Sequence, residues 1–358
     1  MAYLDEQLLT YLGNKRSLLS MIEQGLSEIE KDGEIHSIID LFSGSGVVSR
    51  LFKSKGYEVI SNDLEGYAKI VSECYLSNPE EFDLEKWKEI KAQIDAYPIV
   101  TDGVISTLYA PKDTNNIQKG ERAFYTRENA IRIDTYRAAI DAVCPEEYKK
   151  FFLAPLLSEA SIHTNTSGVF KGFHKDRNTG IGKFGGTRGS ALERIMGNIV
   201  LKPPILSGKS TPYTVHQSDA NELASKLSAD VAYLDPPYNQ HPYGSNYFML
   251  NVILNNEMPI DISAVSGIVA DWNRSNYNKK AKIYDSLNGV IADLDVKYVL
   301  LSYNSEGFLT YDEIIEMMEQ YGEVSVFSTQ YNTFRGCRNL NDRDIHVTEY
   351  VFLLKKNK

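Results

Sequence analysis

The sequence predicts an α/β protein with a seven-stranded, mostly parallel sheet that carries helices on both faces, together with a mainly helical insertion. Strand and helix patterns alternate on both sides of residues 79–210, whereas the segment itself lacks this alternation. The last expected strand, residues 346–355, alternates polar and apolar side chains, as antiparallel strands often do. A chain of 358 residues is long enough for two domains. We therefore expect residues 1–78 and 211–358 to form one domain and residues 79–210 to form the other.

The chain opens with a turn and an amphipathic helix. The run Tyr11-Leu12-Gly13-Asn14-Lys15-Arg16 precedes a helix that we expect to reach about Lys31, because apolar residues recur there with helical spacing. Backbone N–H groups at Gly13-Asn14, together with the Lys15 ammonium, suit an anion. An ordinary helix start accounts for the same residues equally well.

A strand, a glycine loop, a helix and a second strand follow. The strand over Ile35–Leu41 runs into Phe42-Ser43-Gly44-Ser45-Gly46, and the second strand, Glu58–Asn62, ends at Asp63. Glycines let the backbone approach a ligand, and an acid at the end of the second strand is placed for ribose hydroxyls. The pattern therefore favours a nucleoside site, although it lacks the three glycines of a dinucleotide fingerprint. Asp63 also suits the N-cap of a helix over residues 65–77.

The insertion reads as helices followed by a basic loop. We expect helices over residues 87–94, 121–143 and 151–162. In the loop, glycine, phenylalanine and basic residues alternate, a composition typical of a flexible segment that follows a phosphate backbone and offers rings to bases. A solvated loop without a partner is the alternative. The basic residues concerned are Lys171, Lys175, Arg177, Lys183 and Arg188.

The net charge of −10 argues at first against a nucleic-acid partner. The charge is unevenly distributed, because residues 165–209 hold eight basic and two acidic side chains, a local charge of +6, and the rest of the chain carries −16. An acidic body would repel DNA everywhere except at that segment.

Alternation of strands and helices resumes after Pro203-Pro204. We expect a strand over residues 213–217 that ends near Asp219, a helix from Ala220 to Leu227, and a strand over residues 230–234. Further helices are expected over residues 247–254, 281–294 and 311–321, and further strands over residues 297–303, 324–328 and 346–355.

The strand over residues 230–234 ends in Asp235-Pro236-Pro237-Tyr238. Two prolines stop the strand ladder and fix rigid backbone carbonyls beside the carboxylate. A carboxylate and a carbonyl can accept the two hydrogens of a planar amino group, while the tyrosine ring stacks on its heterocycle. A tight turn with Asp235 as a helix cap is the plainer reading of the motif alone.

Several features of the sequence indicate where in the cell the protein acts. The N-terminus lacks the basic and apolar regions of a signal peptide, and no apolar run approaches the length of a membrane span. Three distant cysteines (Cys74, Cys144 and Cys337) exclude a disulfide framework and a clustered thiolate metal site. We expect a cytoplasmic protein that requires no metal.

The order of these features resembles the D12-class, Dam-like family of DNA adenine-N6 methyltransferases, in the motif order of its alpha group. The resemblance extends over nearly the whole chain, from Tyr11–Lys15 through the glycine loop and Asp63 to Asp219 and Asp235–Tyr238. Residues 303–305 and 331–336, the latter containing Arg335, are similar to later motifs of the family.

The resemblance implies a Rossmann-like methyltransferase fold, S-adenosylmethionine as the methyl donor and double-stranded DNA as the partner. It places Tyr11, Gly13, Asn14 and Lys15 at the methionine end of the donor. It further places Phe42, Ser43, Gly44 and Gly46 along the donor's backbone side, Asp63 at the ribose, Asp219-Ala220 at the adenine and Asp235 near the cationic groups. Residues 79–210 would be the DNA-recognition insertion, and Arg335 would join the five basic loop residues in contacting DNA.

The chemistry expected at Asp235–Tyr238 follows from the weak nucleophilicity of the adenine amino group, whose lone pair is delocalised into the ring. Acceptance of the two amino hydrogens by the Asp235 carboxylate and the Pro236 carbonyl would free that lone pair for in-line attack on the methyl group. A base inside a duplex is out of reach, so it must be flipped out and stacked on Tyr238.

The sequence leaves alternatives open. An RNA or cytosine-N4 amino methyltransferase of the same fold would present similar motifs, and a non-catalytic nucleic-acid-binding module would keep the fold. For a DNA adenine methyltransferase, we expect either a restriction-modification system with a cognate restriction endonuclease or an orphan or phage enzyme, and a monomer or weak dimer.

Overall fold

The structure, a computed structural model, describes residues 2–186, 189–332 and 346–357. The chain divides into two compact units. The sheet unit comprises residues 14–64, 207–242 and 274–358, and the helical unit comprises residues 1–13, 65–206 and 243–273.

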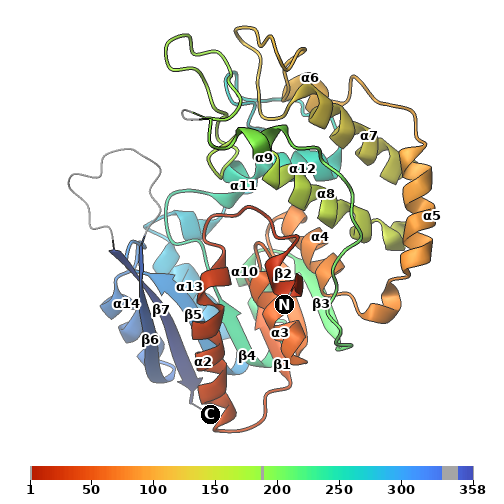
Figure 1. Ribbon diagram of the computed structural model, residues 1–358. Helices are drawn as coiled ribbons and strands as arrows, with labels where there is room; N and C mark the ends of the chain where they lie inside the picture. The colour runs from red at the N-terminus through yellow and green to blue at the C-terminus, as the bar shows by residue number, and fades with distance from the viewer. Residues whose placement is uncertain (1, 187–188, 333–345, 358) are drawn as a thin grey trace. The chain divides into compact units, whose positions relative to one another are not determined.

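The sheet unit contains one seven-stranded sheet (Figure 1). Its strand order is β3-β2-β1-β4-β5-β7-β6. Strands β1 to β5 pair in parallel, and β7 is antiparallel to both of its neighbours, so β6 runs in the direction of the parallel strands. The strands are β1 (Ser37–Asp40), β2 (Glu58–Asp63), β3 (Tyr213–Gln217), β4 (Ser228–Leu234), β5 (Asp295–Asn304), β6 (Gly322–Asn332) and β7 (His346–Lys356).

This arrangement confirms the expected seven-stranded, mostly parallel sheet, because β1 pairs directly with β4 across the interruption of the chain. The antiparallel pairing that the alternation in residues 346–355 suggested is present, because β7 pairs antiparallel with both β5 and β6. Strand β7 lies between β5 and β6, which leaves β6 at the edge of the sheet.

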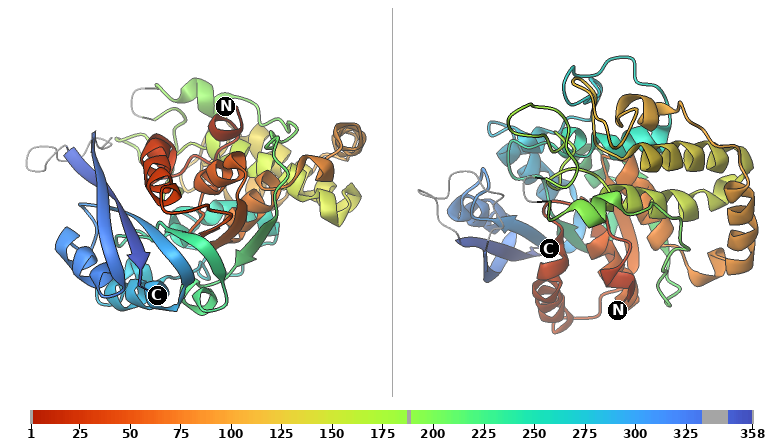
Figure 2. Two further views of the ribbon diagram at one scale, coloured as in Figure 1. Left: turned by 90° about the horizontal axis from the view of Figure 1, so that it is seen from below. Right: turned by 45° about the horizontal axis from the view of Figure 1, so that its top comes forward.

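Helices cover both faces of this sheet, as expected. On one face α2 and α3 pack: the Phe52 ring meets the Tyr233 ring edge-on at 6.0 Å, and Gly25 of α2 lies against Leu300 of β5. On the other face the side chains of α13 and α14 join the inner residues of β1 and β4 in one apolar core. Figure 2 shows α2 and α14 on opposite sides of the sheet. The helices are η1 (Lys15–Leu18), α2 (Leu19–Glu30), α3 (Val47–Lys55), α10 (Ala220–Ala224), η4 (Asn276–Asn278), α13 (Ile283–Asp293) and α14 (Tyr311–Glu319).

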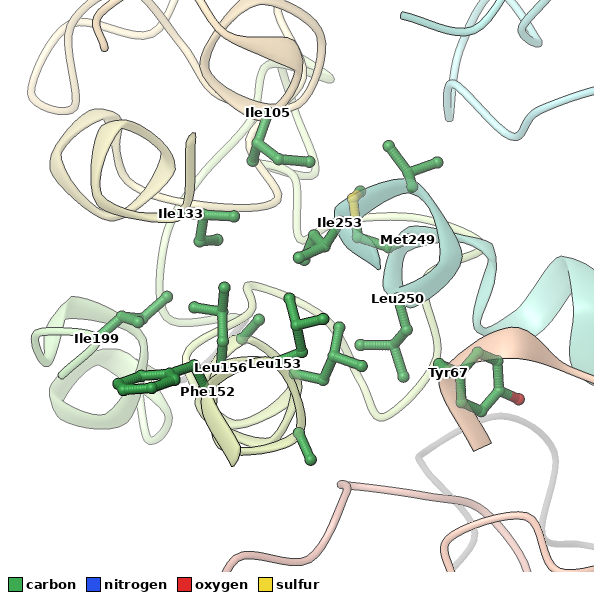
Figure 3. Packing of buried hydrophobic residues seen from close by; sticks show 14 of the residues in the cluster. Tyr67, Ile105, Ile133, Phe152, Leu153, Leu156, Ile199, Met249, Leu250 and Ile253 are labelled. Atoms are coloured by element: carbon green, nitrogen blue, oxygen red, sulfur yellow. The ribbon is translucent and has the colours of Figure 1, made fainter. Parts of the chain in front are cut away.

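The helical unit is built around a second apolar core, to which side chains from α4, α6, α7, α8 and α12 contribute (Figure 3). Trp87 of α5 stacks on Phe152 of α8 at 5.1 Å. The short α6 and α9 were not anticipated. The elements are α1 (Ala2–Asp5), α4 (Gly66–Tyr75), η2 (Pro79–Glu81), α5 (Leu84–Asp95), α6 (Val104–Leu108), α7 (Arg127–Val143), η3 (Glu146–Tyr148), α8 (Lys150–Ile162), α9 (Leu192–Met196), α11 (Tyr243–Asn246) and α12 (Phe248–Asn255).

The boundaries of the two units differ from the expected division at residues 78 and 211, because α4 and residues 243–273 belong to the helical unit. Buried Glu65 explains part of this grouping. Its Oε2 accepts hydrogen bonds from Asn251 at 2.6 Å and Asn273 at 3.1 Å, and Asn251 in turn accepts one from the Tyr67 N–H. These bonds tie three distant stretches of chain together.

Helix α7 begins at Arg127, six residues later than expected, because the Thr126 hydroxyl accepts the Asn129 N–H and caps the helix there. The arginines of this stretch hold the fold rather than forming a basic face. Arg122 donates to the carbonyls of Leu108 and Ser263, and buried Arg137 donates to those at the end of α12.

Candidate active site

The glycine loop after β1 has the conformation that its sequence predicts. Gly44 (φ +49°) and Gly46 (φ +75°) have positive φ angles, which residues with a Cβ rarely adopt, and Gly46 occupies the N-cap of α3. The Gly44 N–H donates to Oδ2 of Asp63 at 2.8 Å. The structure therefore brings together the loop and the acid at the end of β2. Ser43 is buried, and its N–H donates to the Asn62 carbonyl.

Asp63 is not the helix cap that the sequence also allowed. The N-cap position of α4 is Glu65, two residues later, because the chain stays extended through that residue. The Asp63 carboxylate instead accepts a hydrogen bond from the glycine loop.

Asn62 of β2 forms hydrogen bonds with the residues that follow the neighbouring strands β1 and β3. Its side-chain nitrogen donates to the carbonyls of Leu41 and Ser218, at 3.1 and 3.2 Å. The next residue after Ser218, Asp219, accepts the Asn221 N–H at 2.9 Å and caps α10, and Ala220 is buried. Phe42 lies half-buried with its ring edge-to-face against Tyr277 at 5.0 Å. The carboxyl ends of parallel strands are where such folds bind ligands.

The Asp235-Pro236-Pro237-Tyr238 segment leaves the carboxyl end of β4 in this same unit. The Tyr238 carbonyl accepts the Phe308 N–H at 2.9 Å, and the Tyr238 ring meets Tyr303 edge-on at 6.0 Å. Pro236 is buried, whereas Tyr238 is only half-buried. These contacts hold the segment in one conformation and leave part of the tyrosine ring exposed.

Lys15 forms an ion pair with the first residue of this segment. Its Nζ lies 3.1 Å from Oδ1 of Asp235, and Lys15 is only 4% exposed. The same Nζ lies 3.9 Å from Oε2 of Glu349 on β7, and 6.0 Å from the centre of the Tyr238 ring. One buried ammonium thus faces two carboxylates.

Glu349 is a residue that sequence reasoning missed. It lies opposite Asn304 of β5 in the sheet register, and Asn304 was part of a recognised motif. The available signal was one acid within the apolar run Val347–Leu354, but only the pairing of β7 with β5 shows where that acid lies.

Burial dominates the protonation of the two carboxylates but not that of Lys15. It raises the pKa of Asp235 to about 6, while Lys15 acts in the opposite direction. Burial also raises the pKa of Glu349, again against the effect of Lys15. For Lys15 burial lowers the pKa, but Asp235 and Glu349 outweigh it, so the net shift is upward and the ammonium stays charged. Beneath them, burial raises the pKa of Asp40 to about 7.

These residues suit a cationic methyl donor, because two carboxylates facing one ammonium leave a surplus negative charge in a buried place. S-adenosylmethionine carries a sulfonium and supplies an activated methyl group. Among the residues with described positions, Phe42–Gly46, Asp63, Asp219-Ala220, Lys15 and Asp235 stand where they could hold it within the sheet unit.

Tyr11 and Gly13, also expected at the donor, belong to the helical unit. The Tyr11 ring stacks on those of Tyr243 and Tyr247 at 5.0 and 4.4 Å, and its hydroxyl lies 3.1 Å from that of Tyr67. Gly13 has a φ of +75°.

Asn14 belongs to the sheet unit and has a capping role. Its side-chain oxygen accepts the Arg16 N–H at 2.9 Å, which caps η1 and fixes the backbone that carries Lys15.

The basic loop of the helical unit contains a hydrogen-bonded hairpin. Lys175 bridges Gly182, and the Asp176 carboxylate accepts the N–H groups of Asn178 and Thr179 in the turn. Lys171, Lys175, Arg177 and Lys183 are all exposed on it.

The expectation that this loop offers rings to bases is wrong for two of its phenylalanines. Phe170 and Phe173 are 2% and 9% exposed, because both pack against Phe124 in the core of the helical unit. Arg188 and Arg335, which were expected to contact DNA, lie outside the described residues.

Over the part of the chain that the structure describes, no group of three or more His, Cys, Asp or Glu side chains could hold a metal ion. Within the same residues, the helices are too short or too polar to cross a membrane.

Comparison with known proteins shows the family of this chain. The family model for D12 class N6 adenine-specific DNA methyltransferases matches residues 11–317. The chain is 31% identical to the type II methyltransferase M.CviAII of Paramecium bursaria Chlorella virus 1, over 96% of this chain and 97% of that protein. It is 29% identical to the type II methyltransferase M.NlaIII of Neisseria lactamica, over 97% and 99%. The type II methyltransferase M.FokI of Planomicrobium okeanokoites is 26% identical and matches along 52% of its length.

The family match decides between the alternatives that the sequence left open, because it is specific for the N6 amino group of adenine and for DNA. Members of the family take their methyl group from S-adenosylmethionine, which agrees with the surplus negative charge beside Asp235. The seven-stranded sheet is that of a Rossmann-like methyltransferase. From its sequence, its sheet and its carboxylate-lysine site, this chain belongs to the D12 class of N6 adenine-specific DNA methyltransferases.

Proposed function

We propose that methyl transfer to adenine takes place at Asp235-Pro236-Pro237-Tyr238, with the Asp235 carboxylate and the Pro236 carbonyl accepting the two amino hydrogens. The observation that carries this proposal is the placement of Asp235 at the carboxyl end of β4, beside buried Lys15 and next to the half-buried Tyr238. Pro237 keeps the backbone rigid, and the ring of Tyr238 stacks on the flipped base.

The donor's binding residues follow from the same edge of the sheet. Phe42, Ser43, Gly44 and Gly46 would line it along its length, and Asp63 would accept hydrogen bonds from its ribose. The bond from the Gly44 N–H to Asp63 supports a shared role for these two, since it fixes the carboxylate beside the loop. Asp219-Ala220 would contact its adenine, and Tyr11, Gly13, Asn14 and Lys15 its methionine end.

Residues 79–210 would recognise DNA, and residues 1–78 and 211–358 would carry the catalytic site. The local charge of +6 over residues 165–209 supports this division of labour, because the rest of the chain is acidic. The exposed Lys171, Lys175, Arg177 and Lys183 would contact the duplex, and Arg188 and Arg335 are proposed for the same purpose from their sequence positions.

The cellular role of this protein is proposed from the names of its relatives. M.NlaIII and M.CviAII bear the name of type II methyltransferases, and a further relative of Lactococcus lactis is named modification methylase LlaI. By that analogy this chain would act in a restriction-modification system, with a cognate restriction endonuclease as its genetic partner. It would be cytoplasmic, and a monomer or weak dimer.

The test is to incubate the protein with methyl-labelled S-adenosylmethionine and either duplex DNA or RNA, and then to separate the nucleosides. Label in N6-methyldeoxyadenosine, abolished by Asp235→Ala, supports the assignment of the site. Label in N4-methylcytosine or in RNA would contradict it. So would undiminished label in adenine with the Asp235→Ala variant, since the reaction would then take place elsewhere in the protein.

A further inference from the structure

Glu349 stands in the methyl-transfer site without an evident structural reason. Its side chain is 13% exposed, and its Oε1 lies 3.5 Å from the Asn304 amide nitrogen. Its Oε2 is buried, and no hydrogen-bond donor among the residues with described positions reaches it; among the same residues it forms an ion pair with Lys15, at 3.9 Å. A buried carboxylate oxygen left in this state is costly unless a cation comes close.

Among the residues whose positions are described, the charges around Lys15 do not balance. Lys15 contributes one positive charge, while Asp235 and Glu349 contribute two negative ones. Within the described part of the chain, the groups that face these carboxylates from neighbouring elements add no compensating charge: Tyr238 and Tyr233 are neutral phenols, and Asp40 is a third acid. The cluster therefore carries a net charge of about −1 when both carboxylates are ionised.

We propose that Glu349 is a residue for donor selection: it supplies the surplus negative charge by which the site binds cationic S-adenosylmethionine more tightly than neutral S-adenosylhomocysteine. This rests on the proposed placement of the donor beside Asp235. Lys15 alone would neutralise Asp235, so without Glu349 the pair would be neutral and would not distinguish a sulfonium from a thioether.

The reaction itself explains why such selection is useful. Methyl transfer breaks the carbon–sulfur bond, whose electron pair stays on sulfur, and forms a carbon–nitrogen bond at N6, which then loses a proton to water. The donor's net charge falls from +1 to 0 in that step. A site with a surplus negative charge therefore holds the substrate and releases the product, whereas a neutral site would bind the two alike.

Glu349 also gives Lys15 a second partner. The Nζ atom already lies within 4 Å of both carboxylates, so a small displacement toward Glu349 would leave Oδ1 of Asp235 for the adenine amino group. The ammonium would remain paired throughout, which avoids the cost of an isolated buried charge.

The test compares three ligands by isothermal titration calorimetry on the wild type and on Glu349→Gln. The ligands are S-adenosylmethionine, S-adenosylhomocysteine and sinefungin, in which an ammonium-bearing carbon replaces the methylsulfonium. Glutamine keeps the shape and an oxygen for Asn304 but removes the charge. We expect the affinity for both cationic ligands to fall about tenfold, with that for S-adenosylhomocysteine changed less than about twofold.

Two controls make the result specific. Glu323→Gln removes the same charge from the exposed face of the neighbouring strand β6 and should leave all three affinities unchanged. Glu349→Asp keeps the charge and should keep the preference for cations. Where Glu349→Gln does not fold, the wild type alone still tests the idea, because it must bind sinefungin and S-adenosylmethionine more tightly than S-adenosylhomocysteine.

Equal losses for all three ligands in Glu349→Gln, or no cation preference in the wild type, would overturn the role of Glu349. Failure of the proposed donor site would give a different result. In that case an Asp63→Ala variant would bind the three ligands as tightly as the wild type does.

Discussion

The Nζ atom of Lys15 lies 3.1 Å from Oδ1 of Asp235, and the two residues come from chain segments more than two hundred positions apart. The ion pair connects the turn at the start of the chain with the Asp235-Pro236-Pro237-Tyr238 segment. It also opposes the effect of burial on the pKa of Asp235, and a carboxyl group must be ionised to accept both hydrogens of an amino group without donating one.

Activity should therefore depend on pH through Asp235. Burial raises the pKa of this carboxyl to about 6, so the ionised acceptor is present above that pH and is lost as the pH falls through it. We expect the rate under single-turnover conditions to fall about tenfold per pH unit below 6.

The variant Lys15→Met should move this pH limb upward, because it removes the cation that opposes the effect of burial on Asp235. The measurement is the pH–rate profile of each protein with donor and DNA both saturating. A limb that stays in place in Lys15→Met would show that another group titrates.

The variant Asp63→Ala should weaken binding of S-adenosylmethionine by about ten- to a hundredfold, since a hydrogen bond to a charged group is worth roughly 1.5–3 kcal/mol. Part of the loss would come from the Gly44 N–H, which Asp63 now holds at 2.8 Å. Titration calorimetry measures the affinity directly.

Asp230→Asn is the matched control for that experiment. Asp230 accepts hydrogen bonds from the N–H groups of His36 and Ser37 near the opposite end of β4, so its loss should affect stability and leave donor affinity unchanged. Unaltered affinity in Asp63→Ala would confine Asp63 to a structural role.

The variant in which Lys171, Lys175 and Lys183 are changed to alanine should bind all duplex sequences more weakly. Each lysine that contacts a phosphate should reduce the dependence of log K on log salt by about one. A control that removes three exposed lysines elsewhere, Lys31, Lys88 and Lys226, should not change that slope. Binding measured by fluorescence anisotropy across a salt series would contradict the proposal if the two triple variants behaved alike.

We propose Arg177 for reading a base, because arginine matches the two acceptors of guanine. Arg177→Ala should relax the sequence preference at one position and cost about 1–3 kcal/mol on the preferred site, with little change elsewhere. Methylation of a library of randomised duplexes by this variant would show the preference. A uniform loss across all sequences would assign Arg177 to the phosphate backbone instead.

Tyr238→Ala should slow methylation of a matched duplex more than that of a duplex with a mismatch at the target adenine, because a mispaired base costs less to flip. Tyr238→Phe keeps the ring and should retain most activity on both. Equal losses of Tyr238→Ala on the two substrates would argue against stacking on the flipped base.

Local chemistry made much of this site predictable from the sequence. Gly44 and Gly46 adopt the positive φ angles expected of a ligand loop, and Asp63 lies beside that loop because neighbouring parallel strands end at one edge of the sheet. The sheet itself followed from the alternation of strand and helix patterns, with the interrupted halves joined through β1 and β4.

The features that could not be predicted from the sequence depend on long-range strand pairing and on burial. Glu349 is close to Asp235 only because β7 inserts between β5 and β6. Phe170 and Phe173 stand among lysines and glycines, and their sequence pattern does not reveal that they belong to a core formed with Phe124. Likewise, Glu65 groups α4 with distant residues through hydrogen bonds that no periodicity predicts.

The most direct test of the account is the rate of methyl transfer by Asp235→Ala under single-turnover conditions, measured together with its binding of S-adenosylmethionine and its thermal unfolding. Removal of the acceptor for the amino hydrogens should lower the rate by more than about a hundredfold, while the protein stays folded and still binds the donor. A variant that folds, binds the donor and retains more than about a tenth of the wild-type rate would contradict the role assigned to Asp235.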